Sequence, residues 1–189
     1  MVHSARAKAG ELIDALLPFA RAGVAIVGIE PSCLLTLRDE ALAMNLGERA
    51  QCVAKQALLF EEFVSREARA GRFHLQLKAA PAPLLLHAHC HQKAFGAVSS
   101  VLEVLRLIPD ARPELIESSC CGMAGSFGYQ AGHYAISMQM AEAKLLPAIR
   151  KQPVAIIVAD GTSCRHQIRD GTRREALPVA RLLERLMSV

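Results

Sequence analysis

The sequence predicts an α/β protein with a parallel four-stranded sheet flanked by helices. Short apolar runs alternate with longer stretches in which apolar residues recur at helical spacing. Strands separated by helices favour parallel pairing with right-handed crossovers. The composition agrees, because 52% of the 189 residues are hydrophobic and 21% are charged, which suits a globular chain with a sizeable core.

The strands are expected where apolar residues run without a polar interruption. The first of these runs, residues 24–29, is rich in β-branched residues, as is typical of a strand buried on both faces of a parallel sheet. The four expected strands cover residues 24–29, 84–88, 115–118 and 154–159.

The helices are expected where the apolar spacing is close to four residues. Leu12, Leu16 and Phe19 lie on one face of the first helix, and Gly71 is a suitable C-terminal cap for the third. Cys52 falls on an apolar face, which favours a small buried hydrophobe over a ligand. The expected helices cover residues 5–22, 34–45, 50–70, 92–107, 132–150 and 178–187.

Composition argues against several classes of protein. Tryptophan is absent, tyrosine occurs 2 times, and the net charge of +4 is spread along the chain, so nucleic-acid binding is not expected. No apolar stretch is long enough to span a bilayer, and the first residues do not resemble a signal peptide. We therefore expect a cytoplasmic protein whose cysteines are thiols or ligands rather than disulfides.

The cysteines are the most informative residues. Cys120 and Cys121 are adjacent and precede a glycine-rich turn, SSCCGMAGSFG, whose flexibility allows two thiolates to wrap around one soft metal centre. Cys33, Cys90 and Cys164 also follow expected strands directly. Because the carboxyl ends of parallel strands meet at one edge of a sheet, we expect these cysteines to converge.

Three histidines surround Cys90. If the strand extends through residue 91, alternation puts His87, His89 and His91 on one face and Cys90 on the other. The histidines would then supply ligands or hydrogen bonds to thiolates. The alternative is that each is an ordinary hydrogen-bonded residue of a loop.

An internal repeat relates the two ends of the chain. Cys33 aligns with Cys164 at an offset of 164 − 33 = 131 residues. At this offset both copies read as a strand, a turn, Ser-Cys and a helix, which indicates a duplicated unit. The identical pairs are Ile26 and Ile157, Val27 and Val158, Ser32 and Ser163, Arg38 and Arg169, and Asp39 and Asp170. Positions equivalent to Cys90 and Cys120 would precede Met1, so the first copy lacks its own paired cysteines.

Three motifs in order carry a resemblance to a known family. They are HCHQKAFG at 89–96, SSCCGMAGSFGY at 118–129 and ADGTSCRHQI at 159–168. With them the chain resembles the cysteine-rich CCG domain family, which includes the B subunit of heterodisulfide reductase and the iron-sulfur subunit of glycolate oxidase. The likeness is greatest to the C-terminal region of FAD-linked D-2-hydroxyacid dehydrogenases of the D-lactate and D-2-hydroxyglutarate type, and it extends from GIEPSC onward.

The resemblance implies an organisation and a ligand set. It implies that residues 72–189 form a complete CCG unit and residues 1–71 the C-terminal part of a first one, packed as one body. It also implies a [4Fe-4S] cluster, with auxiliary contacts from Cys33, His89 and His91. The implied ligands are Cys90, Cys120, Cys121 and Cys164. The fuller family pattern ends in C-x-x-C, but its first position is Gly161 here and Glu30 in the first copy.

The implied function is electron transfer within an FAD-linked 2-hydroxyacid oxidoreductase. No dinucleotide fingerprint follows the first strand, so FAD is expected on a partner chain or region, with a separate electron acceptor. The chain alone would not be a complete enzyme, and no catalytic residue is assigned to it. One alternative is a structural or docking module whose cysteines hold zinc, since zinc accepts the same sulfur donors. Another is thiol–disulfide chemistry at Cys120 and Cys121.

Overall fold

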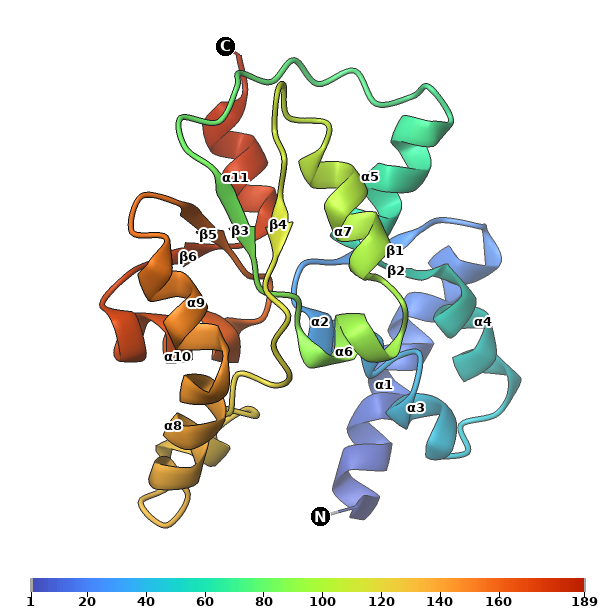
Figure 1. Ribbon diagram of the computed structural model, residues 1–189. Coiled ribbons are helices and arrows are strands. Elements are labelled where there is room, and N and C mark those ends of the chain that lie inside the picture. The colour runs from blue at the N-terminus through green and yellow to red at the C-terminus, as the bar shows by residue number, and fades with distance from the viewer. Residues whose placement is uncertain (1, 189) are drawn as a thin grey trace. The chain divides into compact units, whose positions relative to one another are not determined.

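A computed structural model describes residues 2–188, and the chain divides into two compact units between Phe63 and Val64 (Figure 1). The first unit contains a two-stranded sheet, and the second contains a four-stranded sheet. Within residues 2–188, every helix is too short or too polar to cross a lipid bilayer.

In the first unit, two parallel strands are surrounded by helices. Helix α1 packs against α4, and Ile13 and Val53 are both fully buried. The strands β1 and β2 pair in parallel, with Ile26 opposite Ala57. The elements are α1 (Val2–Arg21), β1 (Ile26–Gly28), α2 (Pro31–Leu35), α3 (Glu40–Ala43), α4 (Glu48–Gln56) and β2 (Ala57–Leu59), followed by α5 (Phe60–Arg69), which continues into the second unit.

Strand β2 interrupts the helix that the sequence predicts over residues 50–70, so that prediction is wrong at its centre. Ala57 and Leu59 are buried, and their backbones pair with β1 instead of closing helical hydrogen bonds. The Leu59 N–H is also accepted by Oε2 of Glu62 at 2.9 Å, which starts α5 anew. Alanine and leucine favour a helix by propensity, so the pairing with β1 overrides the local preference.

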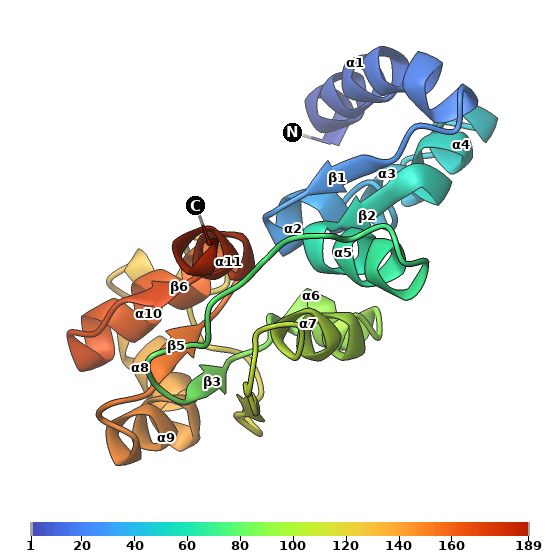
Figure 2. The ribbon, with the colours of Figure 1, turned by 90° about the horizontal axis from the view of Figure 1, so that it is seen from above.

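In the second unit, the sheet has the order β4-β3-β5-β6, and every pair of neighbouring strands is parallel. This confirms the predicted four-stranded parallel sheet flanked by helices. Figure 2 shows α7 and α11 on one side of the sheet and α8, α9 and α10 on the other. The elements are β3 (Leu84–Leu86), α6 (Cys90–Ala94), α7 (Val98–Leu105), β4 (Glu114–Leu115), the 3-10 turn η1 (Phe127–Tyr129), α8 (Tyr134–Ala143), α9 (Leu145–Lys151), β5 (Ile156–Val158), α10 (Thr162–Thr172), β6 (Ala176–Leu177) and α11 (Val179–Leu186).

The core of the second unit follows the strand alternation. Leu85 and Ile157 pack with Leu145 and Ile168, which lie on α9 and α10. Because side chains alternate across a strand, the fully buried Leu84 and Leu86 belong to the opposite face. A strand buried on both faces explains the continuous apolar run of β3.

The membership of the four-stranded sheet differs from the prediction. The expected first strand, β1, pairs with β2 in the other unit, and β6 takes the fourth place. Cys33 follows β1, so the expectation that Cys33 shares a sheet edge with the other cysteines is wrong. Strand β6 has 2 residues, which is too short to leave a periodic signal in the sequence.

Two expected helices are divided in the structure. Gly96, with a φ of +68°, separates α6 from α7, because a left-handed residue ends a helix. The expected helix over 132–150 is divided at Lys144 into α8 and α9. Pro147 lies in the first turn of α9, where its missing N–H costs little.

The segments aligned by the repeat share their register. Ile26 opposes Ala57 in the first unit, and its counterpart Ile157 opposes Ala176 in the second. The helices α2 and α10 begin at the aligned residues Pro31 and Thr162. The assignment of residues 1–71 and 72–189 to a partial and a complete CCG unit stays a prediction.

Candidate functional site

The candidate site lies where β3 and β5 end. His87 follows β3 directly, and its backbone N–H donates to the Val158 carbonyl at 2.9 Å. On the other side of β3, the Leu86 carbonyl accepts the Ile116 N–H at 2.9 Å. Strands on both sides therefore hold His87 in place, and its side chain is only 1% exposed.

Cys90 is presented at the start of α6. His89 is the N-cap of this helix, where its Nδ1 accepts the His91 N–H at 3.2 Å. Oε1 of Gln92 accepts the His89 N–H at 2.9 Å and completes a capping box. The helix therefore begins at Cys90, which is exposed, and the strand does not extend through residue 91. The shared face predicted for His87, His89 and His91 is wrong for this reason.

A buried carboxylate ties three elements together behind α6. Oδ2 of Asp160 accepts from Nε2 of Gln92 at 2.8 Å, and Oδ1 accepts the Val179 N–H at 2.9 Å. Asp160 is 1% exposed, and this burial raises the pKa of its carboxyl. The end of β5 is thus linked to α6 and to the start of α11.

Lys93 holds the entry to the paired-cysteine loop. Its Nζ donates to the carbonyls of Ser118 and Ser119, at 2.5 Å and 2.9 Å. Partial burial lowers the pKa of Lys93, although the neighbouring cysteines oppose this effect. Lys93 thereby connects the cysteine-bearing start of α6 to the loop that carries Cys120 and Cys121.

Gly122 is required where that loop turns. Its φ is +90°, and a Cβ added here would lie 2.2 Å from the backbone oxygen of Ser137. Its N–H donates to Sγ of Cys120 at 3.3 Å. The glycine therefore allows a close approach to α8 and supplies a hydrogen bond to a candidate ligand sulfur.

Cys164 comes from the first turn of α10 and is 2% exposed. Gly161 precedes that helix, and a Cβ at this position would lie 2.3 Å from Cδ2 of His89 and 3.2 Å from Sγ of Cys164. The ring of His89 therefore occupies the space that a side chain at 161 would need. This explains physically how glycine fits where the family pattern has a cysteine.

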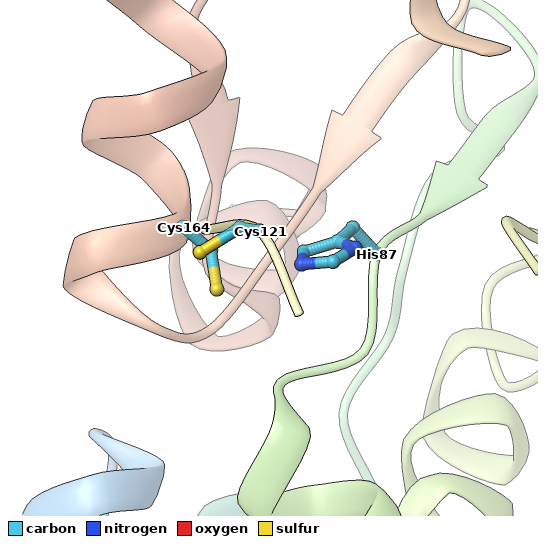
Figure 3. A group of neighbouring side chains, drawn as sticks. All are labelled: His87, Cys121 and Cys164. Carbon is cyan, nitrogen blue, oxygen red and sulfur yellow. The ribbon is translucent and has the colours of Figure 1, made fainter. Parts of the chain in front are cut away.

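Three ligand atoms form the compact centre of the site. One ring nitrogen of His87 and the sulfurs of Cys121 and Cys164 all lie within 4.8 Å of one another (Figure 3). All three residues are buried, and they come from the end of β3, the paired-cysteine loop and α10. This is the group that could hold a metal ion among the side chains described in residues 2–188.

The other two cysteines extend this group toward the surface. Hydrogen bonding, from Cys121 first and then Cys90, lowers the pKa of the Cys120 thiol. Hydrogen bonding to Cys121 likewise lowers the pKa of Cys164. The same contacts, together with burial, raise the pKa of Cys90 and of Cys121. The four thiols thus form a continuous series from the exposed Cys90 to the buried Cys164.

The remaining candidates are two histidines and two cysteines. Nδ1 of His89 lies 3.8 Å from Sγ of Cys90, and its ring meets that of His91 edge to face, with centroids 5.1 Å apart. Cys33 is exposed in the first unit, where its backbone N–H donates to Oε2 of Glu30 at 2.9 Å. Cys52 is half-buried on α4. Sequence reasoning did not single out His87 from its neighbours, because the signal that does so is its burial.

Comparisons with known proteins agree with this picture. Residues 84–169 match the family model described as CCG, a cysteine-rich domain. The chain is 28% identical over 151 residues to the C subunit of anaerobic glycerol-3-phosphate dehydrogenase of Escherichia coli K12, covering 79% of this chain and 37% of that protein. It is 29% identical over 162 residues to D-2-hydroxyglutarate dehydrogenase of Pantoea ananatis, covering 85% of this chain and 15% of that protein. It is also 28% identical over 180 residues to D-2-hydroxyglutarate dehydrogenase of Escherichia coli K12, covering 90% of this chain and 16% of that protein.

The matched part contains the whole candidate centre. The chain spans well under half the length of the curated relatives it matches. His87 and all of the clustered cysteines lie within the family match. Residues 84–169, from β3 into α10, are therefore similar to cysteine-rich domains of the CCG type.

Proposed function

We propose that this chain is an electron-transfer module in which four cysteines hold an iron-sulfur cluster of the [4Fe-4S] type. The proposed ligands are Cys90, Cys120, Cys121 and Cys164. One observation carries the proposal: these cysteines come from three separate segments within the residues that match the CCG model, each shifts the pKa of its neighbour, and the sulfurs of Cys121 and Cys164 lie within 4.8 Å of each other. Four converging sulfur donors are the set that a cubane cluster takes.

The surroundings of the sulfurs support a redox centre. Cys121 and Cys164 are 3% and 2% exposed, so a bound group would be shielded from water on that side. The lowered pKa of Cys120 and Cys164 favours the thiolate form, which binds metal. The Gly122 N–H donates to the Cys120 sulfur, and such hydrogen bonds tune the reduction potential of a cluster.

We further propose that the module works with an FAD-binding dehydrogenase of the 2-hydroxyacid type, on a partner chain or region. The name D-2-hydroxyglutarate dehydrogenase, borne by relatives, supports this choice. Oxidation of a 2-hydroxyacid to a 2-oxoacid releases two electrons and two protons. The flavin would take the electron pair, and a cluster, when bound, passes electrons on singly to an acceptor. A reducing compartment such as the cytoplasm suits free thiol ligands.

Anaerobic purification followed by iron, acid-labile sulfide and zinc analysis tests the cluster. We expect a brown protein with about four irons and four sulfides per chain, as a [4Fe-4S] cluster requires. Cys164→Ser should lose most of this content. Cys52→Ser is the matched control, since Cys52 lies on α4 outside the series, and it should retain the content.

The same measurement separates the alternative function. A colourless chain with stoichiometric zinc and no sulfide would contradict the electron-transfer proposal and favour a docking module. Photoreduced free flavin then serves as an electron donor for the cluster-containing chain. Bleaching of the cluster absorption, with recovery on adding a quinone, is the expected result; a cluster that free flavin cannot reduce would argue against relay from a flavin.

A further inference from the structure

One ring nitrogen of His87 is buried without a hydrogen-bond partner in residues 2–188, which is energetically unfavourable. The side chain is 1% exposed, and its Nδ1 lies 3.0 Å from Oγ of Ser118. Its Nε2 is buried and has no partner at normal hydrogen-bond geometry among the residues that the structure describes, although the ring is near enough to help lower the pKa of the Cys164 thiol. A buried polar atom without a partner costs about 1–3 kcal/mol, so an arrangement that retains one needs an explanation.

The ring is oriented toward the sulfurs. Figure 3 shows a nitrogen of His87 facing Cys121 and Cys164, and the ligand atoms of the three residues lie within 4.8 Å of one another. Since Nδ1 is engaged by Ser118, Nε2 is the nitrogen left for a ligand. A zinc ion shared by the three, or an iron of a cluster bound next to the nitrogen, would satisfy the unpartnered nitrogen.

We propose that Nε2 of His87 is a direct ligand of the metal centre, together with the sulfurs of Cys121 and Cys164. The centre then has mixed nitrogen and sulfur coordination, which suits an iron of a cluster or a zinc ion. With iron as the metal, this proposal rests on the cluster proposed above, and His87 would then replace one of the four cysteines, because each iron of a cubane takes one protein ligand. His87 lies on the buried side of the four-cysteine series, beside Cys121 and Cys164.

Two features of the structure pre-organise this ligand. Oγ of Ser118 is placed to accept the Nδ1 proton, which leaves the Nε2 lone pair free, as metal-binding histidines require. The backbone of His87 is fixed by its hydrogen bond to Val158. The ring therefore cannot swing away without losing its contact with Ser118.

Two other histidines also have buried unpartnered nitrogens. His91 and His133 each leave Nδ1 without a partner, yet neither belongs to the compact group of ligand atoms. His133 stacks on Phe127, with ring centroids 4.1 Å apart. His133 is thus a matched control: it is a histidine of similar burial at the nitrogen, in the same unit, away from the sulfurs.

For the test, the chain is produced with natural-abundance or 15N-labelled histidine, purified without oxygen and loaded with iron and sulfide. Pulsed electron paramagnetic resonance of the reduced cluster should detect a nitrogen coupling that changes with the label. His87→Ala should abolish the coupling, while His133→Ala keeps it. His87→Cys should keep the iron content of the wild-type chain. Its cluster should have a lower reduction potential than the wild-type cluster, because replacing nitrogen by thiolate adds negative charge.

The outcomes separate the two proposals. A cluster without histidine coupling, unchanged in His87→Ala, would overturn the ligand role of His87 and leave the electron-transfer proposal standing. If no cluster forms, the electron-transfer proposal fails. Titration of the metal-free chain with Co²⁺ then tests whether His87 is a metal ligand. We then expect His87→Ala to weaken Co²⁺ binding about tenfold or more, and Ser118→Ala about tenfold. Unchanged Co²⁺ affinity in a folded His87→Ala or His87→Gln chain would contradict the proposal.

Discussion

Gly122→Ala should weaken both the fold of the second unit and metal binding at the proposed centre. A φ of +90° strains any side chain by about 1–2 kcal/mol. The new Cβ would also lie 2.2 Å from the Ser137 backbone oxygen, so the loop or α8 must move, at about 1–3 kcal/mol. Together this is about 2–5 kcal/mol, against a typical total stability of about 5–15 kcal/mol. Urea unfolding of the metal-free chain measures the loss.

Gly125→Ala, on the same loop, is the matched control. Its φ is +66°, but a Cβ there would meet nothing within 4 Å. Only the strain of about 1–2 kcal/mol should remain, and metal retention should change little. Displacing Gly122 also moves its N–H from the Cys120 sulfur, so metal affinity should fall in Gly122→Ala alone. Equal destabilisation by the two substitutions would refute the argument from the Ser137 contact.

Three further substitutions test the supports of the site. Lys93→Met leaves two loop carbonyls without their donor and should cost about 1–3 kcal/mol in thermal unfolding, with weaker metal retention; an unchanged melting temperature would contradict this. Burial raises the pKa of Asp160, so the folded chain holds its proton where the unfolded chain, with a pKa of about 3.9, has lost it. The free energy of unfolding of the wild-type chain should therefore fall as the pH rises from about 4 through the folded pKa. In urea unfolding at several pH values, Asp160→Asn should show a smaller fall. If the two chains lose stability in parallel as the pH rises, Asp160 does not titrate in this range. Arg174→Ala removes donors to the carbonyls of α9 and the segment before β5, and should cost about 2–3 kcal/mol, whereas Arg181→Ala breaks only an exposed ion pair and should cost under about 1 kcal/mol; similar losses would contradict the role of Arg174.

The class of the second unit follows from local pattern. The buried runs of β3 and β5 are apolar on both faces, which only a sheet covered by helices on both sides accommodates. The sequence therefore predicts parallel strands and flanking helices at nearly their observed places. The pairing partner of each strand could not be predicted as well. The strands β2 and β6 have only 3 and 2 residues, and they form through pairing rather than propensity.

The cysteines of the candidate centre were also readable from the chain. Cys90, Cys121 and Cys164 come after strands of one sheet, and the residues that leave such strands gather at the edge where the strands end. Cys33 obeys the same local pattern, yet its strand belongs to another sheet. A strand followed by a cysteine identifies an edge but not the sheet to which that edge belongs.

The α/β class, the paired cysteines on a glycine-rich turn and their likeness to CCG domains could all be predicted from the sequence, because spacing and residue type are local properties. Which histidine lies beside the sulfurs depends on the folded chain. His87, His89 and His91 are equivalent as letters in the chain. They differ once β3 ends at Leu86: His89 caps α6, while His87 is buried with a nitrogen facing two sulfurs. The burial and the partners of each ring nitrogen depend on packing between distant segments. The same packing places His87 and Cys164 next to Cys121 of the cysteine pair.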